Sequence, residues 1–153
     1  MSKENPLLDL RTKIDALDVQ IMENISQRAN FAQQVAKVKK GLGDTAYYRP
    51  EREAQVLRRV MESNTGPLDN EDMARLFRQI MSSCLALEQP IKVAFLGPEG
   101  TFTQEAALKH FGDAAISVPM SAIDEVFREV LAGACNYGAV SYTHLRAHET
   151  RHD

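Results

Sequence analysis

The sequence predicts a mainly α fold, in which three helices fill the first ninety residues and the beginning of an α/β unit follows. Apolar residues recur at three- and four-residue spacing as far as about residue 88, which is the periodicity of amphipathic helices. After Pro90 a short β-type run ends in a glycine turn, and helical and β-type stretches then alternate. Strands that alternate with helices indicate a parallel sheet.

The first predicted helix runs from about Leu7 to Lys40. Asn5 and Pro6 supply a cap acceptor and a proline suited to the first turn, and the glycines after Lys40 end the pattern. Such a helix is about 50 Å long at 1.5 Å per residue. Two shorter helices cannot cover it, so we expect an intertwined homodimer.

The second and third helices are bounded by ordinary start and stop signals. The second begins near Pro50 and stops at the run that opens with Ser63. The third is capped by Asp69, with Asp72 at its third position. Beyond Pro90 we expect strands over 91–96, 116–118 and 137–140 and helices over 104–111 and 123–131. These units are too few to bury a sheet or close a cleft, and their exposed strand edges are an aggregation hazard.

The composition excludes several classes of protein. The chain has 153 residues, 44% hydrophobic and 25% charged, with a net charge of −3, which are ordinary values for a soluble globular protein. It has no basic excess and no aromatic platforms beside basic residues, so we expect no nucleic-acid partner. No apolar run approaches the roughly 18 residues that span a bilayer, so we expect no membrane partner either. Cys84 and Cys135 have no disulfide or metal-ligand spacing, which favours a cytoplasmic location.

Three cations on the first helix indicate a binding site for a small anion with more than one carboxylate. Arg28 and Lys39 are interleaved with the apolar stripe, where long cations are rare unless they are paired. They share a face about 16 Å apart, whereas Arg11 lies about 25 Å from Arg28. If two copies of the helix pack antiparallel around residue 22, Arg11 of the partner subunit comes level with residue 33, between Arg28 and Lys39.

Each of these residues also has an ordinary structural explanation. A lone Arg or Lys on a helix is usually a solvated charge whose stem covers apolar surface. Arg52 and Glu53 can form an exposed pair of little energetic value. Glu88 can be a surface residue near a helix end, and Cys84 a small core residue on the same helix face, four positions earlier. Only the occurrence of all these residues together indicates a binding site.

The joint pattern resembles a known family. The span from Leu7 to Gln89, with the motif Arg49-Pro-Glu-Arg-Glu53 at the start of the second helix, resembles the all-helical chorismate mutase domain. The run Val93-Ala-Phe-Leu-Gly-Pro-Glu-Gly-Thr-Phe102 resembles the opening signature of prephenate dehydratase, whose fold is similar to periplasmic binding proteins. Together they resemble the bifunctional chorismate mutase/prephenate dehydratases of phenylalanine biosynthesis.

The resemblance implies a role for each residue of the pattern. Arg28 and Arg11 of the partner subunit would clamp the two carboxylates of chorismate. Lys39 would donate to the ether oxygen whose bond breaks, Glu53 would accept from the ring hydroxyl, and Arg52 would support a carboxylate. The rearrangement to prephenate is pericyclic, so no nucleophile, metal or cofactor is expected. Catalysis would come from holding the reactive conformer and from donors aimed at developing charge.

Three positions depart from the family. Glu88 stands where some members have Gln, and a carboxyl donates a hydrogen bond only when protonated. We therefore expect mutase activity to fall as rising pH ionises Glu88. Cys84 stands where Ser can occur and Arg49 where Asp can occur, and the resemblance assigns no role to either residue.

The predicted domains are a mutase domain over 1–90, a truncated dehydratase portion over 91–140 and a non-native tail over 141–153. The tail resembles one reading frame of a transposase sequencing adapter. Its histidines, at 144, 148 and 152, have helical spacing but are not expected to bind metal. Because the dehydratase's Thr-Arg-Phe segment and regulatory domain are missing, we expect neither dehydratase activity nor phenylalanine feedback. The alternative is a non-catalytic helical dimerisation or regulatory module, which would not need Arg11, Arg28, Lys39 and Glu53 together.

Overall fold

The computed structural model describes residues 6–44 and 48–141, and the chain divides into two compact units. The first unit is Met1–Asp44 and the second is Thr45–Asp153. The second and third helices thus lie in the same unit as the sheet. The tail predicted over 141–153 falls, except for Ser141, outside the described residues. No helix in these described ranges has both the length and the apolar character to cross a membrane.

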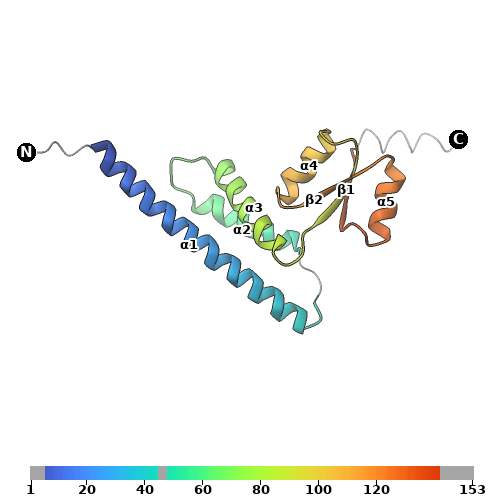
Figure 1. Cartoon of the computed structure of the whole chain (residues 1–153), viewed down its shortest axis with the longest axis horizontal. Helices are drawn as coiled ribbons and strands as arrows, with labels where there is room; N and C mark the ends of the chain where they lie inside the picture. Colours follow the sequence, from blue (N-terminus) through green and yellow to red (C-terminus); the bar gives the residue numbers. More distant parts are fainter. Residues whose placement is uncertain (1–5, 45–47, 142–153) are drawn as a thin grey trace, which may run out of the picture. The chain divides into compact units, whose positions relative to one another are not determined.

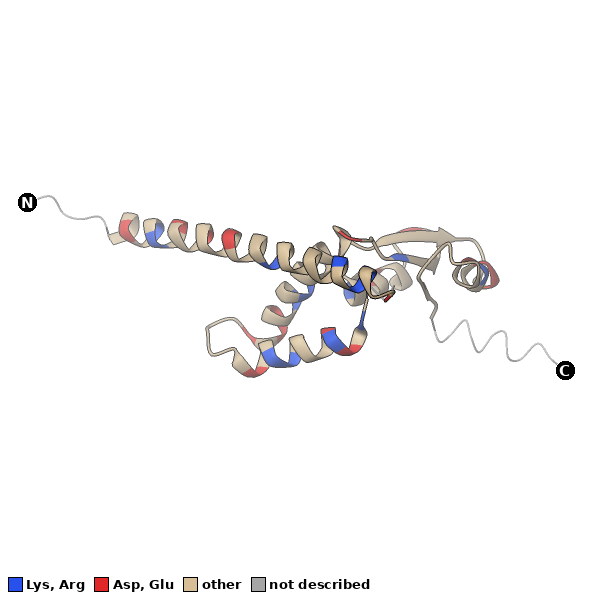
Figure 2. Ribbon diagram, turned by 90° about the horizontal axis from the view of Figure 1, so that it is seen from below, with Lys and Arg blue, Asp and Glu red and all other residues tan. Residues whose placement is uncertain are grey.

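The first unit is one long helix, α1 (Pro6–Gly41), which confirms the long helix predicted from about Leu7 to Lys40. Its large apolar residues are more than one-third exposed along the whole length, among them Leu10 (56%), Ile21 (54%) and Val38 (63%). The charges are unevenly distributed. Residues 6–24 hold four acidic and two basic side chains, whereas residues 25–41 hold four basic and no acidic ones. Figure 2 shows this change of colour along α1.

The second unit begins with two packed helices, α2 (Pro50–Ser63) and α3 (Asn70–Ala86). Pro50 occupies the first turn of α2, where its missing N–H costs no hydrogen bond. The carboxylate of Asp69 accepts a 2.7 Å hydrogen bond from the backbone N–H of Asp72, which confirms the predicted cap of α3. Leu57 of α2 and Ala74 of α3 are buried.

The rest of the second unit is a three-stranded parallel sheet with two helices, here called the sheet module (residues 92–139). Its elements are β1 (Lys92–Leu96), α4 (Phe102–Phe111), β2 (Ile116–Met120), α5 (Ile123–Leu131) and β3 (Tyr137–Ala139). The strand order is β2-β1-β3, and both pairings are parallel. In Figure 1, α4 and α5 lie on opposite sides of β1.

The middle of the central strand is fully buried. Val93, Ala94 and Phe95 are each 1% exposed or less. Val93 packs with Ala107 of α4, whereas Ala94 packs with Val126 of α5, as the two-residue alternation of a strand requires. The expectation that these units are too few to bury a sheet is therefore wrong for β1. Two helices suffice, because each covers one face of a narrow sheet.

The edges of the sheet agree with the prediction. In the described part of the chain, β2 and β3 each pair only with β1. Ile116, at the start of β2, is 44% exposed. The outer edges of β2 and β3 thus leave backbone groups available to another strand.

Candidate active site

The three predicted cations of the first unit all lie on α1. The helix is unbroken from Pro6 to Gly41, so Arg11 and Arg28 remain about 25 Å apart along its axis. Arg28 and Lys39 are separated by about 16 Å on the same basis. One copy of α1 therefore cannot bring Arg11 to a small ligand held between Arg28 and Lys39.

The other five predicted residues lie in the second unit, three of them at the start of α2. Arg49 occupies the cap position of α2, with an extended backbone. Arg52 and Glu53 lie in the first turn, where the helix dipole favours a carboxylate. Arg52 is exposed and its Nη1 lies 3.4 Å from Oε1 of Gln55.

Glu53 is the carboxylate among these three residues at the start of α2. Its side chain is only 18% exposed, and its Oε1 lies 3.6 Å from Nε of Arg78 on α3. The phenol of Tyr48, which precedes α2, lies close enough to this carboxylate for the charge of Glu53 to act on it. Burial and then the Glu53 charge raise the pKa of Tyr48 to about 12, because both disfavour a phenolate.

Cys84 and Glu88 lie at the end of α3 but not on one helix face as predicted. Cys84 is on the helix and 4% exposed, whereas α3 ends at Ala86 and Glu88 lies in the following turn. The backbone N–H of Glu88 bonds to the carbonyl of Leu85, three residues earlier, so the turn is tighter than an α-helical one. Pro90 cannot continue a helix, which accounts for the early end.

Two residues of this environment, Tyr48 and Arg78, were missed by the sequence analysis. Arg78 is 25 positions from Glu53, and only the packing of α3 on α2 brings them together. Tyr48 carries no helical or motif signal, because it precedes the start of α2. The pair of aromatic residues just before Arg49 was the one available clue.

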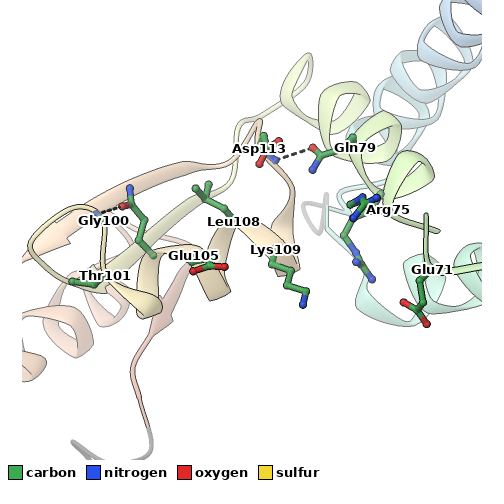
Figure 3. A pocket seen from close by; sticks show the side chains of 11 residues that line it. Glu71, Arg75, Gln79, Gly100, Thr101, Glu105, Leu108, Lys109 and Asp113 are labelled. Atoms are coloured by element: carbon green, nitrogen blue, oxygen red, sulfur yellow. Dashed lines mark hydrogen bonds between the residues drawn. The ribbon is translucent and has the colours of Figure 1, made fainter. Parts of the chain in front are cut away.

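A cavity of about 740 Å³ lies between α3 and α4 in the second unit. Figure 3 shows side chains of α3, among them Arg75 and Gln79, opposite Glu105 and Lys109 of α4. Three basic and three acidic residues line the cavity, so its charge favours neither an anionic nor a cationic ligand. None of the predicted site residues lines it. Within the described ranges, no group of three potential metal-ligating side chains occurs.

Comparisons with known proteins match both parts of the chain. The profile of the chorismate mutase type II family matches residues 10–89, and the prephenate dehydratase profile matches residues 93–143. The second match thus ends inside the segment that was predicted to be a non-native tail.

Curated relatives agree with both matches. A bifunctional chorismate mutase/prephenate dehydratase of Pseudomonas aeruginosa is 65% identical over 92% of this chain. Proteins of the same name from Aquifex aeolicus and Escherichia coli K12 are 37% and 29% identical over 88% and 92% of this chain. The chain spans about two-fifths of the length of these relatives: 40%, 38% and 40%, respectively.

A solved structure supports the family at the level of the fold. The chorismate mutase of Thermus thermophilus (form II) is similar with a TM-score of 0.53 and 28% identity, over 56% of this chain and 96% of that one. Together with the profile that spans all three N-terminal helices, this likeness assigns the chain: it belongs to the chorismate mutase type II family.

Proposed function

We propose that the chain catalyses the rearrangement of chorismate to prephenate, a step in the biosynthesis of phenylalanine. The observation that carries this proposal is the match of the mutase family to residues 10–89, a span that contains every predicted site residue. Arg28 and Lys39 lie on the basic half of α1, while Arg52 and the enclosed Glu53 lie at the start of α2.

The proposed chemistry requires geometry and electrostatics only. Two guanidinium groups would hold the two carboxylates of chorismate in the compact conformer that can react. Lys39 would donate to the ether oxygen, where negative charge grows as its bond to carbon breaks. Glu53 would accept from the ring hydroxyl. At the remaining position, Glu88 would donate to the ether oxygen when it is protonated.

We propose that the active form is an antiparallel homodimer in which Arg11 of the partner subunit completes each site. The apolar face of α1 is more than one-third exposed, and an isolated helix is rarely stable in water without tertiary packing of its apolar face. The acidic half of α1 would also lie against the basic half of a second, antiparallel α1, which is favourable electrostatically.

We further propose that residues 1–90 are the mutase domain and that residues 91–140 begin a dehydratase domain of the periplasmic-binding-protein type. The matched ranges 10–89 and 93–143 and the parallel order β2-β1-β3 support this division. The described strands and helices make up one sheet layer, so we expect no conversion of prephenate to phenylpyruvate. The proposed location is the cytoplasm.

The test is chorismate turnover by the purified chain, with prephenate and phenylpyruvate measured separately. The informative variant is Arg28→Ala, and Lys37→Ala is its matched control, because both lie in the basic half of α1. We expect Arg28→Ala to reduce kcat/KM by at least about 100-fold and Lys37→Ala to have little effect. A helical dimer that does not consume chorismate would favour the non-catalytic module instead.

A further inference from the structure

We propose that the sheet module caps α2 from outside the helix. Phe111 and Tyr137 hold the ring of Tyr48, and Tyr48 fixes the first turn of α2 through the backbone that joins them. This turn carries Arg52 and Glu53, so the inference rests on the proposed mutase function where it concerns activity. Tyr48 is then a positioning residue that would not touch the substrate.

The start of α2 lacks the side chains that ordinarily cap a helix. Arg49, at the cap position, has donors only and makes no cap hydrogen bond within the described residues. Arg52, three positions later, cannot accept a hydrogen bond from the cap backbone, as the Glu or Gln of a capping box would. Pro50 favours the helical backbone but satisfies no N–H of the first turn. The first turn therefore needs support from outside α2.

Tyr48 occupies the position before the cap. In a hydrophobic staple, a residue at this position packs on an apolar side chain at the fourth helical position. That position is Glu53 here, so the helix offers the ring no such partner. The ring packs instead against a buried cluster that extends from the residue before β1 to α4: Ile91, Val93 and Ala107. A contact outside α2 thus takes the place of the staple.

Two aromatic rings of the sheet module hold the ring of Tyr48. Its centroid lies 5.5 Å from that of Phe111, the last residue of α4, with 62° between the planes. It lies 5.6 Å from the centroid of Tyr137, the first residue of β3, with 86° between the planes. Such edge-to-face arrangements are favoured between aromatic rings. Phe111 and Tyr137 also contact each other, at 4.8 Å, so the three rings form one cluster.

The end of α4 that carries this cluster is itself attached to α3. Asp113, two residues after Phe111, donates its backbone N–H to Oε1 of Gln79 on α3 at 3.0 Å. Because α3 packs on α2, the aromatic cluster is held in place relative to the body of α2. The cluster can therefore restrain the start of that helix.

The backbone carries this restraint into the first turn of α2. The carbonyl of Arg49 accepts hydrogen bonds from the N–H groups of Arg52 and Glu53, both at 3.1 Å. Arg49 is bonded to Tyr48, so an anchored Tyr48 ring restricts the movement of this carbonyl. Connecting segments are ordinarily more mobile than the elements they join. Without the cluster the first turn would open more often, and its side chains would be less well oriented for a substrate.

Hydrogen exchange of the full chain tests the cap without any substrate. Tyr48→Leu removes the ring, so we expect the amides of Arg52 and Glu53 to exchange about tenfold faster. Tyr48→Phe keeps the ring and loses a hydroxyl that lies 3.4 Å from Nε2 of His110, a long contact, so exchange should stay within about twofold of the unmodified chain. The amide of Val60, near the end of α2, should not change. Unchanged exchange at Glu53 in Tyr48→Leu, or equal acceleration at Val60, would overturn the proposal.

A second pair of variants tests the part played by the sheet module. Phe111→Leu removes a ring that contacts Tyr48 and should accelerate exchange in the first turn of α2 as Tyr48→Leu does. Phe102→Leu is the matched control, because Phe102 is also on α4 but 91% exposed, and should leave that exchange unchanged. Equal exchange at Glu53 in these two variants would contradict the role of the sheet module.

Activity separates positioning from a purely structural role. Under conditions in which every variant is folded, Tyr48→Leu should reduce kcat/KM for chorismate about tenfold, whereas Tyr48→Phe should retain most of it. Faster exchange at Glu53 with unchanged kcat/KM would overturn the assignment of Tyr48 as a positioning residue. If the unmodified chain does not consume chorismate, the proposed function fails, while the exchange rates still decide whether the sheet module caps α2.

Discussion

Gly112 and Ser82 approach so closely that no side chain fits at residue 112. A Cβ on Gly112, which follows α4, would lie 2.3 Å from the Cβ of Ser82 on α3. The next residue, Asp113, donates its backbone N–H to Oε1 of Gln79 at 3.0 Å. The end of α4 is thus fastened directly to α3, next to the aromatic contacts of Tyr48.

Replacing Gly112 by alanine tests this close approach. Gly112 has φ +85° as well as the steric conflict, whereas Gly100 has φ +83° and nothing within 4 Å of an added Cβ. Gly100→Ala is therefore the control for a positive φ without the steric conflict, and such a backbone conformation costs an alanine of order 1 kcal/mol. We expect Gly112→Ala to lower the free energy of unfolding by about 1–3 kcal/mol more. Equal urea midpoints for the two variants would show that Ser82 gives way.

The partner's contribution of Arg11 can be tested by mixing two inactive variants. Arg11→Ala and Arg28→Ala should each lack mutase activity as homodimers. In a mixed dimer, one site combines Arg28 of the first chain with Arg11 of the second and is intact. Random mixing should then restore about one-quarter of the normal activity. If no activity returns although the subunits exchange, both arginines belong to the same chain's site.

We predict that Glu88 makes the proposed reaction dependent on pH. A carboxyl can donate to the ether oxygen only while it is protonated, so kcat should fall as rising pH ionises Glu88. Glu88→Gln keeps a donor at every pH and should flatten the profile. The measurement is kcat against pH for both chains. A profile that Glu88→Gln leaves unchanged would remove this side chain from the mechanism.

Because the pKa of Tyr48 is raised, we expect the folded chain to lose stability in alkaline solution. This pKa is raised from 10.0 to about 12, first by burial and then by the charge of Glu53. Between these values the folded chain retains a proton that the unfolded chain has released. The contribution of Tyr48 protonation to the free energy of unfolding is therefore complete below pH 10 and is lost as pH rises toward 12. Urea midpoints over this range should fall less steeply for Tyr48→Phe, and parallel slopes would contradict the prediction.

The chemistry of neighbouring residues was sufficient to predict much of the secondary structure. Pro50 and Asp69 mark where α2 and α3 begin, because a proline without an N–H and a short acceptor side chain satisfy the needs of a helix start. The predicted bounds of α5, 123–131, also agree with the structure. Spacing alone placed Arg28 and Lys39 on α1, because helical periodicity depends only on positions along the chain.

Tertiary packing decided the rest. No local signal indicated that α4 and α5 would bury both faces of β1, or that α3 would end before Glu88. The surroundings of Glu53 come from Arg78 and from Tyr48, which Phe111 and Tyr137 hold from far along the chain. The sequence by itself determined which helices and strands form and which charges they carry. Only the folded structure decided what encloses those charges, because burial and orientation arise from contacts between segments that are distant in sequence.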